Sequence, residues 1–338
     1  MQKNNKHIRY IKNDRLPVIK PGYKGNKLID NKFANGNELY LPDFKNVIRW
    51  KLTTNPQKKE KAADHYTPQV HTGNHFVTST EDMIVWLGHA TFFIRVNGIT
   101  FITDPIFYDL PLIQRRVALP CPPSQLQDIN YMLLSHGHRD HLDEKSVKTL
   151  FNYNPGMKAM IPLRAGEILR GIARELPYQE AGWYQQYDLI APGVEVYYLP
   201  ASHWHRRGLF DMNKVLWGSF LIKTEKITIY FAGDSGLNDH FGEIEQLFGP
   251  IDICIMPVGA YKPPFMMQKS HMNPHEAVKA FNQLRGGTFI PMHYGTYDLS
   301  DEPAGEPIRI LEQLAAGGIL QDLRIPAIGE PVLLQPFY

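Results

Sequence analysis

A short segment of the chain concentrates side chains that bind metal ions. Residues 136–141 contain His136, His138, Asp140 and His141 in an HxHxDH pattern. Imidazole nitrogens and carboxylate oxygens are ordinary ligands of Zn²⁺ and similar cations. His136 and His138 are two positions apart and can turn toward one metal ion, whereas Asp140 and His141 come later and can turn toward a second. The pattern therefore predicts a site for two metal ions. A solvated histidine-rich turn is the alternative, but buried unpaired groups of this kind would be costly.

This segment lies where a strand is expected to end and a helix to begin. Residues 131–134 are hydrophobic, and residues 143–151 have a helical pattern. Sites in α/β proteins commonly occupy this position, so further ligands should follow other strands. A single His or Asp after a strand usually has a structural role. Here, however, three strands after the HxHxDH segment are followed, in turn, by a His, an Asp and a His, and this order indicates metal ligands. The three candidates are His203 after residues 194–199, Asp234 after residues 227–232, and His293 after residues 288–290.

The rest of the pattern predicts an α/β fold. From residue 83 onward, apolar segments of strand length alternate with helical stretches, which implies two packed sheets with helices outside. The clearest helix start is at Asn273, where Pro274 suits the first turn and Glu276 can complete a capping box. The expected strands are residues 83–87, 92–96, 100–103, 131–134, 159–162, 194–199, 216–222, 227–232, 252–257, 288–291 and 331–334, and the expected helices are residues 144–152, 164–174, 237–247, 274–284 and 305–315.

The chain is expected to form one catalytic domain preceded by a basic arm. No internal repeat and no low-complexity linker divides residues 80–338. We assign residues 46–338 to the catalytic domain and residues 1–45 to an extended arm, whose Pro, Gly and Asn content disfavours helix. Residues 1–30 contain eight Lys or Arg and two Asp. Such an arm could contact an anionic lipid surface or lie as a solvated strap along the domain.

Composition disfavours several other classes of protein. Of the 338 residues, 43% are hydrophobic, and the net charge of +2 gives no general attraction to nucleic acid. No apolar stretch approaches the length of a membrane span, and the N-terminus lacks the apolar segment of a signal peptide. Cys121 and Cys254 are far apart, so a disulfide framework is not expected. These features favour a cytoplasmic protein.

The HxHxDH segment and the later His203, Asp234 and His293 resemble the metal-binding residues of the metallo-β-lactamase superfamily. Within it, the chain resembles the branch of phospholipases D that hydrolyse N-acyl-phosphatidylethanolamine. The HxHxDH cluster alone specifies only the superfamily, whereas the WLGHAT and NKVLWGS segments indicate the branch. The resemblance extends from about residue 46 to residue 330, and residues 114–123 depart from it. The segments that carry it are residues 86–91 (WLGHAT), 103–107 (TDPIF), 134–143 (LSHGHRDHLD), 213–219 (NKVLWGS), 231–234 (FAGD), 249–250 (GP), 258–261 (VGAY) and 274–278 (PHEAV).

The resemblance implies an αββα four-layer sandwich, the metallo-β-lactamase fold, with a dinuclear metal site at one edge. Two Zn²⁺ ions suit the nitrogen and oxygen ligands, with Fe or Mn as alternatives. His205 competes with His203 as a ligand, and Asp104 is implied as the carboxylate that orients the ligand segment from outside; a simple turn role is the alternative for Asp104. The implied ligands are His136, His138 and His203 for one metal ion and Asp140, His141 and His293 for the other, with Asp234 bridging.

The implied chemistry is the hydrolysis of a phosphodiester. Two cations about 3.5–4 Å apart lower the pKa of a shared water, and the bridging hydroxide can attack phosphorus in line. A phospholipase D type reaction on N-acyl-phosphatidylethanolamine-like lipids would release the headgroup alcohol and leave phosphatidate. Asp140 is implied as a ligand that takes part in catalysis, and His271 as the proton donor to the leaving alkoxide. A loop histidine on the surface is the alternative for His271.

An apolar stretch suggests how a lipid is recognised. Tyr261, Phe265, Met266 and Met267 lie within a few positions of one another, in a region expected to be a loop. Exposed apolar residues of this kind need a partner, and methionine adapts to acyl chains of varied shape. We expect these residues to bind a phospholipid or small phosphodiester, with peripheral membrane contact. Packing in the core or in a homodimer interface is the alternative.

Three other functions stay open at this stage. A sugar-phosphate lactonase shares the fold and the metal ions but needs a small polar pocket. A ribonuclease Z-like nuclease needs a basic arm near the site, whereas the basic residues here lie far away in the sequence. A non-catalytic relic of the fold is the third alternative, although such relics usually lose ligands and all seven candidates are present here.

Overall fold

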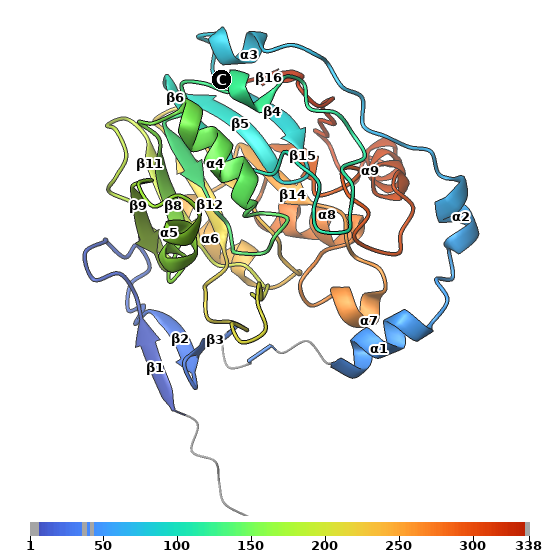
Figure 1. Cartoon of the computed structure of the whole chain (residues 1–338), viewed down its shortest axis with the longest axis horizontal. Helices are drawn as coiled ribbons and strands as arrows, with labels where there is room; N and C mark the ends of the chain where they lie inside the picture. The colour runs from blue at the N-terminus through green and yellow to red at the C-terminus, as the bar shows by residue number, and fades with distance from the viewer. Residues whose placement is uncertain (1–6, 36–38, 41–43, 335–338) are drawn as a thin grey trace, which may run out of the picture.

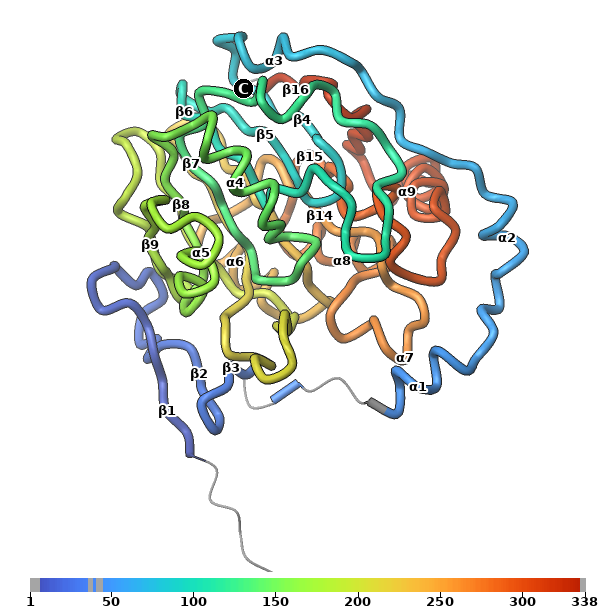
Figure 2. Tube along the Cα trace, viewed as in Figure 1, coloured from blue at the N-terminus to red at the C-terminus, as the bar shows by residue number. Residues whose placement is uncertain are grey.

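The computed structural model describes residues 7–35, 39–40 and 44–334 of the chain. Two β-sheets face each other, and helices cover the outer face of each sheet (Figure 1). The same chain path is followed more easily in the tube view, where the N-terminal segment runs along one side of the sandwich (Figure 2). This architecture confirms the predicted α/β class and the αββα four-layer sandwich.

The first sheet has seven strands. β6 to β9 are parallel to one another, and the remaining neighbours are antiparallel. The strand order is β16 (Pro331–Leu333), β4 (Met83–Gly88), β5 (Thr91–Val96), β6 (Ile99–Thr103), β7 (Tyr131–Leu133), β8 (Lys158–Pro162) and β9 (Tyr178–Ala181).

The second sheet has six strands, and its last three are parallel. The strand order is β10 (Gln185–Gln186), β11 (Glu195–Leu199), β12 (Ser219–Lys223), β13 (Thr228–Phe231), β14 (Ile253–Pro257) and β15 (Thr288–Met292). The helices are α1 (Phe44–Leu52), α2 (Lys58–Ala63), α3 (His75–Thr78), α4 (Glu144–Tyr153), α5 (Gly166–Ile172), α6 (His240–Phe248), α7 (Pro264–Met267), α8 (Pro274–Gln283) and α9 (Glu306–Ala316), with a 3₁₀ turn at Pro123–Gln125.

Side-chain alternation along the strands builds two apolar layers. In β4 and β5, Ile84, Trp86 and Phe92 point into the core between the sheets. Their neighbours Val85 and Phe93 point to the opposite face, where they cluster with apolar residues of α3, α4 and α5. Successive residues of a strand face opposite sides of the sheet, so a strand that is covered on both faces is apolar throughout. This is why these segments appear as continuous hydrophobic runs in the sequence.

The carboxyl ends of four strands meet at one edge of the sandwich. The segments after β7, β11, β13 and β15 carry, in turn, the HxHxDH cluster, His203, Asp234 and His293. Ligand sites in α/β proteins form outside the carboxyl ends of strands. The predicted capping box at the start of α8 is confirmed: Asn273 accepts from the Glu276 amide, and Glu276 accepts from the Asn273 amide.

The basic N-terminal segment contributes a small sheet that packs against the domain. β1 (Ile8–Ile11), β2 (Asn26–Ile29) and β3 (Lys32–Phe33) pair in that order. Leu28 and Phe33 join the main core, and Val18 bridges to Gln185 on β10. Lys3 and Lys6 lie outside the described residues. The segment therefore carries its own buried side chains, and the domain division at residue 45 stays a prediction.

The cysteines and the helices were also the subject of predictions from composition. Cys121 and Cys254 are both free and buried. Among the residues that the structure describes, no helix combines the length and the apolar character that crossing a bilayer requires.

Candidate metal centre

Three histidines converge to form the first group of metal-binding atoms. His136 Nε2 is 2.9 Å from His138 Nδ1, and His138 Nδ1 is 3.1 Å from His203 Nε2. Nitrogens bound to one Zn²⁺ at about 2.0–2.1 Å come this close to each other. His203 Nδ1 lies 3.0 Å from the Ser270 carbonyl oxygen. That contact places a proton on Nδ1 and leaves Nε2 as a ligand atom.

A second group lies beside the first. His141 Nε2 and His293 Nε2 are each 3.6 Å from Asp140 Oδ2. The same two nitrogens are 3.1 Å and 3.2 Å from Asp234 Oδ2. Two imidazoles and two carboxylate oxygens at these separations can surround a single cation. The structure therefore brings together the residues that the sequence assigned to the second metal ion.

Asp234 stands between the two groups. Its Oδ2 is close to the second group and also lies 4.0 Å from His136 Nε2 and 3.9 Å from His203 Nε2. The side chain is buried. A single carboxylate at this position can contribute oxygens to both cations, which is the geometry of a bridging ligand.

Several of these atoms are buried without a hydrogen-bond partner among the described residues. They include His141 Nε2, His293 Nε2 and Asp234 Oδ1. Buried polar atoms are nearly always satisfied, and an unsatisfied one costs about 1–3 kcal/mol. They belong to residues whose possible ligand atoms lie within 4.8 Å of one another in overlapping groups, so the donor set fits a pair of divalent cations such as Zn²⁺.

The local electrostatics are those of a site built for positive charge. Burial raises the pKa of Asp140 and Asp234, but His141 and the other neighbouring histidines together outweigh it, and both pKa values fall well below the usual range. Burial would lower the pKa of His141, and the charges of Asp234 and Asp140 raise it instead. The two carboxylates thus require cationic neighbours, which bound metal ions would supply.

Asp104 supports the ligand segment from outside. Its Oδ2 lies 2.8 Å from His141 Nδ1, and its Oδ1 accepts the Ser135 amide at 2.7 Å. The Ser135 hydroxyl donates to Asp104 Oδ2 at 2.5 Å and lies 2.9 Å from His136 Nδ1. One buried carboxylate therefore orients a ligand of each metal group, which agrees with the outer position implied by the resemblance.

His205 is not part of either group of metal-binding atoms. Its ring stacks parallel to that of His138, with centroids 6.1 Å apart. The ring nitrogens are buried against Gly137, where a Cβ would lie 2.5 Å from Nε2. This packing explains why Gly occupies position 137, and it favours His203 over His205 as the ligand.

His271 lies at the centre, as the sequence analysis expected. Its Nδ1 is 3.9 Å from Asp234 Oδ2, and its ring packs edge to face against His203. Burial lowers the pKa of His271 to about 4, although the charge of Asp234 opposes the shift. The imidazole is therefore neutral at pH 7 in the free protein.

A cavity of about 460 Å³ opens onto these residues. His138, Asp140, Asp234, His271 and His293 form its floor. Its walls come from five separate segments and are mostly apolar, with Arg139 and Arg206 as cationic members. The apolar wall residues are Val47 of α1, Leu110, Pro111 and Ile113 of the loop after β6, Trp204 of the loop after β11, Met266 and Met267 of α7, and Leu299.

Two of the four residues expected to bind substrate do not line this cavity. Tyr261 is buried and its hydroxyl donates to Glu306, so the side chain is turned into the protein. Phe265 faces Arg49 of α1, whose guanidinium lies 4.3 Å from the ring centroid. Residues 264–267 form a helical turn rather than the expected loop. A helix turns Met266 and Met267 toward one side and Phe265 toward another, which a loop assignment cannot anticipate.

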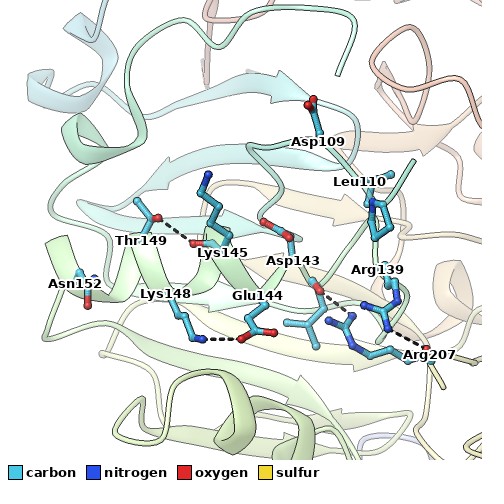
Figure 3. A pocket seen from close by; sticks show the side chains of 12 residues that line it. Asp109, Leu110, Arg139, Asp143, Glu144, Lys145, Lys148, Thr149, Asn152 and Arg207 are labelled. Atoms are coloured by element: carbon cyan, nitrogen blue, oxygen red, sulfur yellow. Dashed lines mark hydrogen bonds and ion pairs between the residues drawn. The ribbon is translucent and has the colours of Figure 1, made fainter. Parts of the chain in front are cut away.

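A second, polar groove of about 640 Å³ lies on the outer side of the ligand segment (Figure 3). Its charged side chains already have partners. Lys148 pairs with Glu144 at 2.6 Å, and Arg207 donates to the Leu142 carbonyl oxygen at 2.8 Å. The groove shares Leu110, Pro111 and Arg139 with the apolar cavity but contains none of the histidine ligands. We therefore place the chemistry in the apolar cavity.

One residue at the centre escaped the sequence analysis. His89, in the turn between β4 and β5, is buried, and its Nε2 lies 3.2 Å from Asp140 Oδ2. It belongs to the same group of possible ligand atoms as Asp140, His141 and His293. Its position in the WLGHAT segment could have identified it as a site residue. A histidine in a tight turn between two strands is common, however, so the sequence alone did not single it out.

Comparison with known proteins agrees with the fold. A model of the beta-lactamase superfamily domain matches residues 100–294. The N-acyl-phosphatidylethanolamine-hydrolyzing phospholipase D 1 of Caenorhabditis elegans is 32% identical over 271 residues, which is 76% of each chain. The mitochondrial N-acyl-phosphatidylethanolamine-hydrolyzing phospholipase D of Saccharomyces cerevisiae is 32% identical over 256 residues, which is 70% of this chain and 52% of the relative.

Solved structures share the architecture at low sequence identity. The isothiocyanate hydrolase from Delia radicum gut bacteria aligns with a TM-score of 0.62 at 19% identity, covering 75% of this chain and 99% of that one. Igni18, a metallo hydrolase from Ignicoccus hospitalis, aligns with a TM-score of 0.58 at 20% identity, covering 76% and 99%.

The four-layer sandwich and the clustered histidines and carboxylates at its edge define a class of metal-dependent hydrolases. The chain belongs to the metallo-β-lactamase superfamily. The walls of the cavity bear on the class of its substrate.

Proposed function

We propose that the protein is a dinuclear metal-dependent phosphodiesterase that acts on lipid phosphodiesters in a phospholipase D type reaction. The observation that carries the proposal is the cavity, because it joins a metal-binding floor to apolar walls. A lipid phosphodiester needs both: cations for the phosphoryl oxygens and an apolar surface for the chains. The similarity to N-acyl-phosphatidylethanolamine-hydrolyzing phospholipases D supports this substrate class.

Each part of the site has a defined role in the proposed reaction. His136, His138 and His203 would hold one metal ion, and Asp140, His141 and His293 the other, with Asp234 shared. When bound, two divalent cations supply Lewis acidity toward a phosphoryl oxygen and lower the pKa of a water molecule. We favour Zn²⁺, with Fe or Mn as alternatives.

The chain's own groups would complete the hydrolysis. Water adds to phosphorus, the bond from phosphorus to the headgroup oxygen breaks, and phosphatidate and a free alcohol result. His271 would hydrogen-bond the leaving oxygen. Because its pKa is about 4 in the metal-free protein, His271 is neutral before the substrate binds and would donate its ring N–H to that oxygen as a hydrogen bond. Arg139 and Arg206 at the cavity wall would pair with anionic groups of the lipid.

A substrate panel tests the proposal. The wild type should hydrolyse a long-chain N-acyl-phosphatidylethanolamine faster than a lactone or a single-stranded RNA.

Replacing Met266 and Met267 with Ser should slow hydrolysis of the long-chain diester. Each buried CH₂ contributes about 0.8 kcal/mol, so the loss of two or three such contacts should lower the rate on this substrate about tenfold or more. A short water-soluble diester should be cleaved at nearly the native rate.

Phe265→Ser is the matched control, since this side chain lies on the same helix outside the cavity. With monomeric substrates it should leave the chain-length preference unchanged. Rates that are unchanged from the wild type on both the long and the short diester in the double variant would remove the methionines from lipid recognition. Turnover of the lactone alone would favour the lactonase alternative.

The mouth of the cavity supports the proposed peripheral contact with a membrane. Three of the segments that line the cavity also carry exposed apolar side chains: Leu52 on α1, Leu112 on the loop after β6, and Leu209 and Phe210 on the loop after β11. In Figure 1, α1, α7 and the loop after β11 lie on the same side of the molecule. Apolar side chains gathered around a lipid-sized opening can enter the headgroup layer of a bilayer.

Replacing Leu209 and Phe210 with Ser should weaken binding to phosphatidylcholine vesicles that contain an anionic lipid. Burial of such a side chain contributes about 1.5–3 kcal/mol, so the double variant should bind at least about tenfold less in a sedimentation assay. Ile319→Ser, which removes an exposed apolar side chain after α9, is the control. Equal vesicle binding by all three proteins would contradict the membrane contact.

A further inference from the structure

The turn that contains His89 has a left-handed backbone. β4 ends at Gly88 and β5 begins at Thr91, so His89 and Ala90 form the connection. His89 has a φ of 53°, a left-handed conformation that is uncommon for residues other than glycine. Strained backbone of this kind persists only where the surroundings enforce it, and it concentrates at functional sites.

The backbone of His89 is held from three directions. Its amide donates to Thr296 Oγ1 at 2.7 Å. Its carbonyl oxygen accepts the Trp86 indole N–H at 2.9 Å and the His293 amide at 3.1 Å. The last contact joins the turn directly to a ligand of the second metal group. His293 also has a left-handed φ of 65°, so the carbonyl of His89 helps to fix an unusual backbone that aims a metal-binding ring.

The ring of His89 reaches a different ligand of the same group. Its Nε2 lies 3.2 Å from Asp140 Oδ2, the oxygen that is also 3.6 Å from His141 Nε2 and from His293 Nε2. The ring is packed between His293, with centroids 4.0 Å apart, and Tyr297, which it meets edge to face at 5.3 Å. Little freedom remains for the imidazole, so the direction of its Nε2 is set.

The contacts of His89 differ from those of the two ligand histidines in one respect. His141 and His293 each lie near both Asp140 and Asp234. The ion pair of His89 that the structure records is with Asp140. The ligand atom of His89 nevertheless lies within 4.8 Å of those of Asp140, His141 and His293, so a hydrogen bond to Asp140 and direct binding of the metal ion have to be separated by experiment.

We infer that His89 is a positioning residue of the second metal site: its Nε2–H donates to Asp140 and fixes the carboxylate for the metal ion, while its backbone carbonyl fixes His293. The inference rests on the proposed dinuclear centre. Outer partners of this kind orient ligands and change metal affinity by about 10–100-fold when they are removed. One residue from the β4–β5 turn would thus serve two ligands that come from different sheets.

Two substitutions of similar size separate a hydrogen-bond role from a packing role. His89→Gln keeps an N–H donor at a reach close to that of Nε2, whereas His89→Leu keeps apolar volume and removes the donor. Both retain a Cβ, so both experience the same left-handed backbone. Zn²⁺ alone is titrated into each apoprotein against a chelating dye, and the geometry of the Co²⁺-loaded form is followed by its visible absorption spectrum.

The wild type and His89→Gln should bind two metal ions with similar affinities and similar Co²⁺ spectra. His89→Leu should bind the first ion normally and the second about 10–100-fold more weakly. His240→Leu, which removes a buried histidine of α6 outside the metal groups, should bind as the wild type and so controls for loss of a buried imidazole.

Equal weakening in the Gln and Leu variants would overturn the inference, because the ring would then act as a ligand or as packing. Unchanged affinity in His89→Leu would overturn it as well. A wild-type protein that binds no Zn²⁺ would contradict the proposed function itself, and that result is distinguishable because it precedes any comparison between variants.

Discussion

Replacing Asp234 with Asn is expected to remove metal ions and activity together. Asp234 Oδ2 lies 3.1–3.2 Å from His141 Nε2 and His293 Nε2 and 3.9–4.0 Å from His203 Nε2 and His136 Nε2. A carboxylate can give an oxygen and negative charge to each of two cations, whereas an amide has one neutral oxygen. The loss of metal affinity should therefore exceed the 10–100-fold change that outer partners typically produce.

Metal content by elemental analysis and turnover of bis(p-nitrophenyl) phosphate measure this effect. Turnover should fall to background, since without the cations the pKa of water returns from about 7 toward 15.7. Asp239→Asn is the matched control: it makes the same chemical change five positions later, at an exposed residue. Full metal content and full turnover in Asp234→Asn would show that the ligand assignment is wrong.

The candidate ligands could be proposed from the sequence because local patterns determine where strands end. His203, Asp234 and His293 each follow an apolar run, and strands buried on both faces give exactly such runs. Once the strands are placed, their carboxyl ends share an edge, so residues more than a hundred positions apart meet. The strand and helix predictions from residue 83 onward succeeded for the same reason.

The walls of the cavity were not accessible in this way. Val47, Leu110 and Leu299 come from an amphipathic helix, a loop and a turn, and no local pattern says that these segments lie over the same opening. Their arrangement depends on tertiary packing of segments without periodic signals. The small N-terminal sheet was missed for a related reason, since strands of two to four residues are too short to show alternation.

Side-chain direction was the third limit of the sequence analysis. Tyr261 and Met267 belong to the same apolar stretch of the sequence. Only Met267 lines the cavity, because the Tyr261 hydroxyl donates a hydrogen bond to Glu306 and its ring is turned away. His89 shows the converse, because only the left-handed turn and its contact with Asp140 reveal its place at the centre. Residue type and spacing identify candidates, and the partners of each side chain decide among them.

Replacing His271 with Ala should slow hydrolysis of alkyl phosphodiesters and leave the metal ions bound. Its Nδ1 is 3.9 Å from Asp234 Oδ2, and His271 lines the cavity together with the candidate ligands His138, Asp140 and His293. Assistance to a leaving alkoxide is worth about 10²–10⁴-fold in rate. A p-nitrophenolate leaving group is stable without a proton, so that substrate should lose much less. The measurement is the ratio of kcat values for the two substrates at equal metal content.

His275→Ala is the matched control for this variant, because His275 is exposed on α8 four positions away and should leave both rates unchanged. The possible outcomes separate three roles for His271. A large loss confined to the alkyl ester identifies assistance to the leaving group. Equal losses on both substrates would instead make His271 a binding residue. Loss of a metal ion would make it a ligand, an arrangement for which its proximity to His203 and Asp234 provides the geometry.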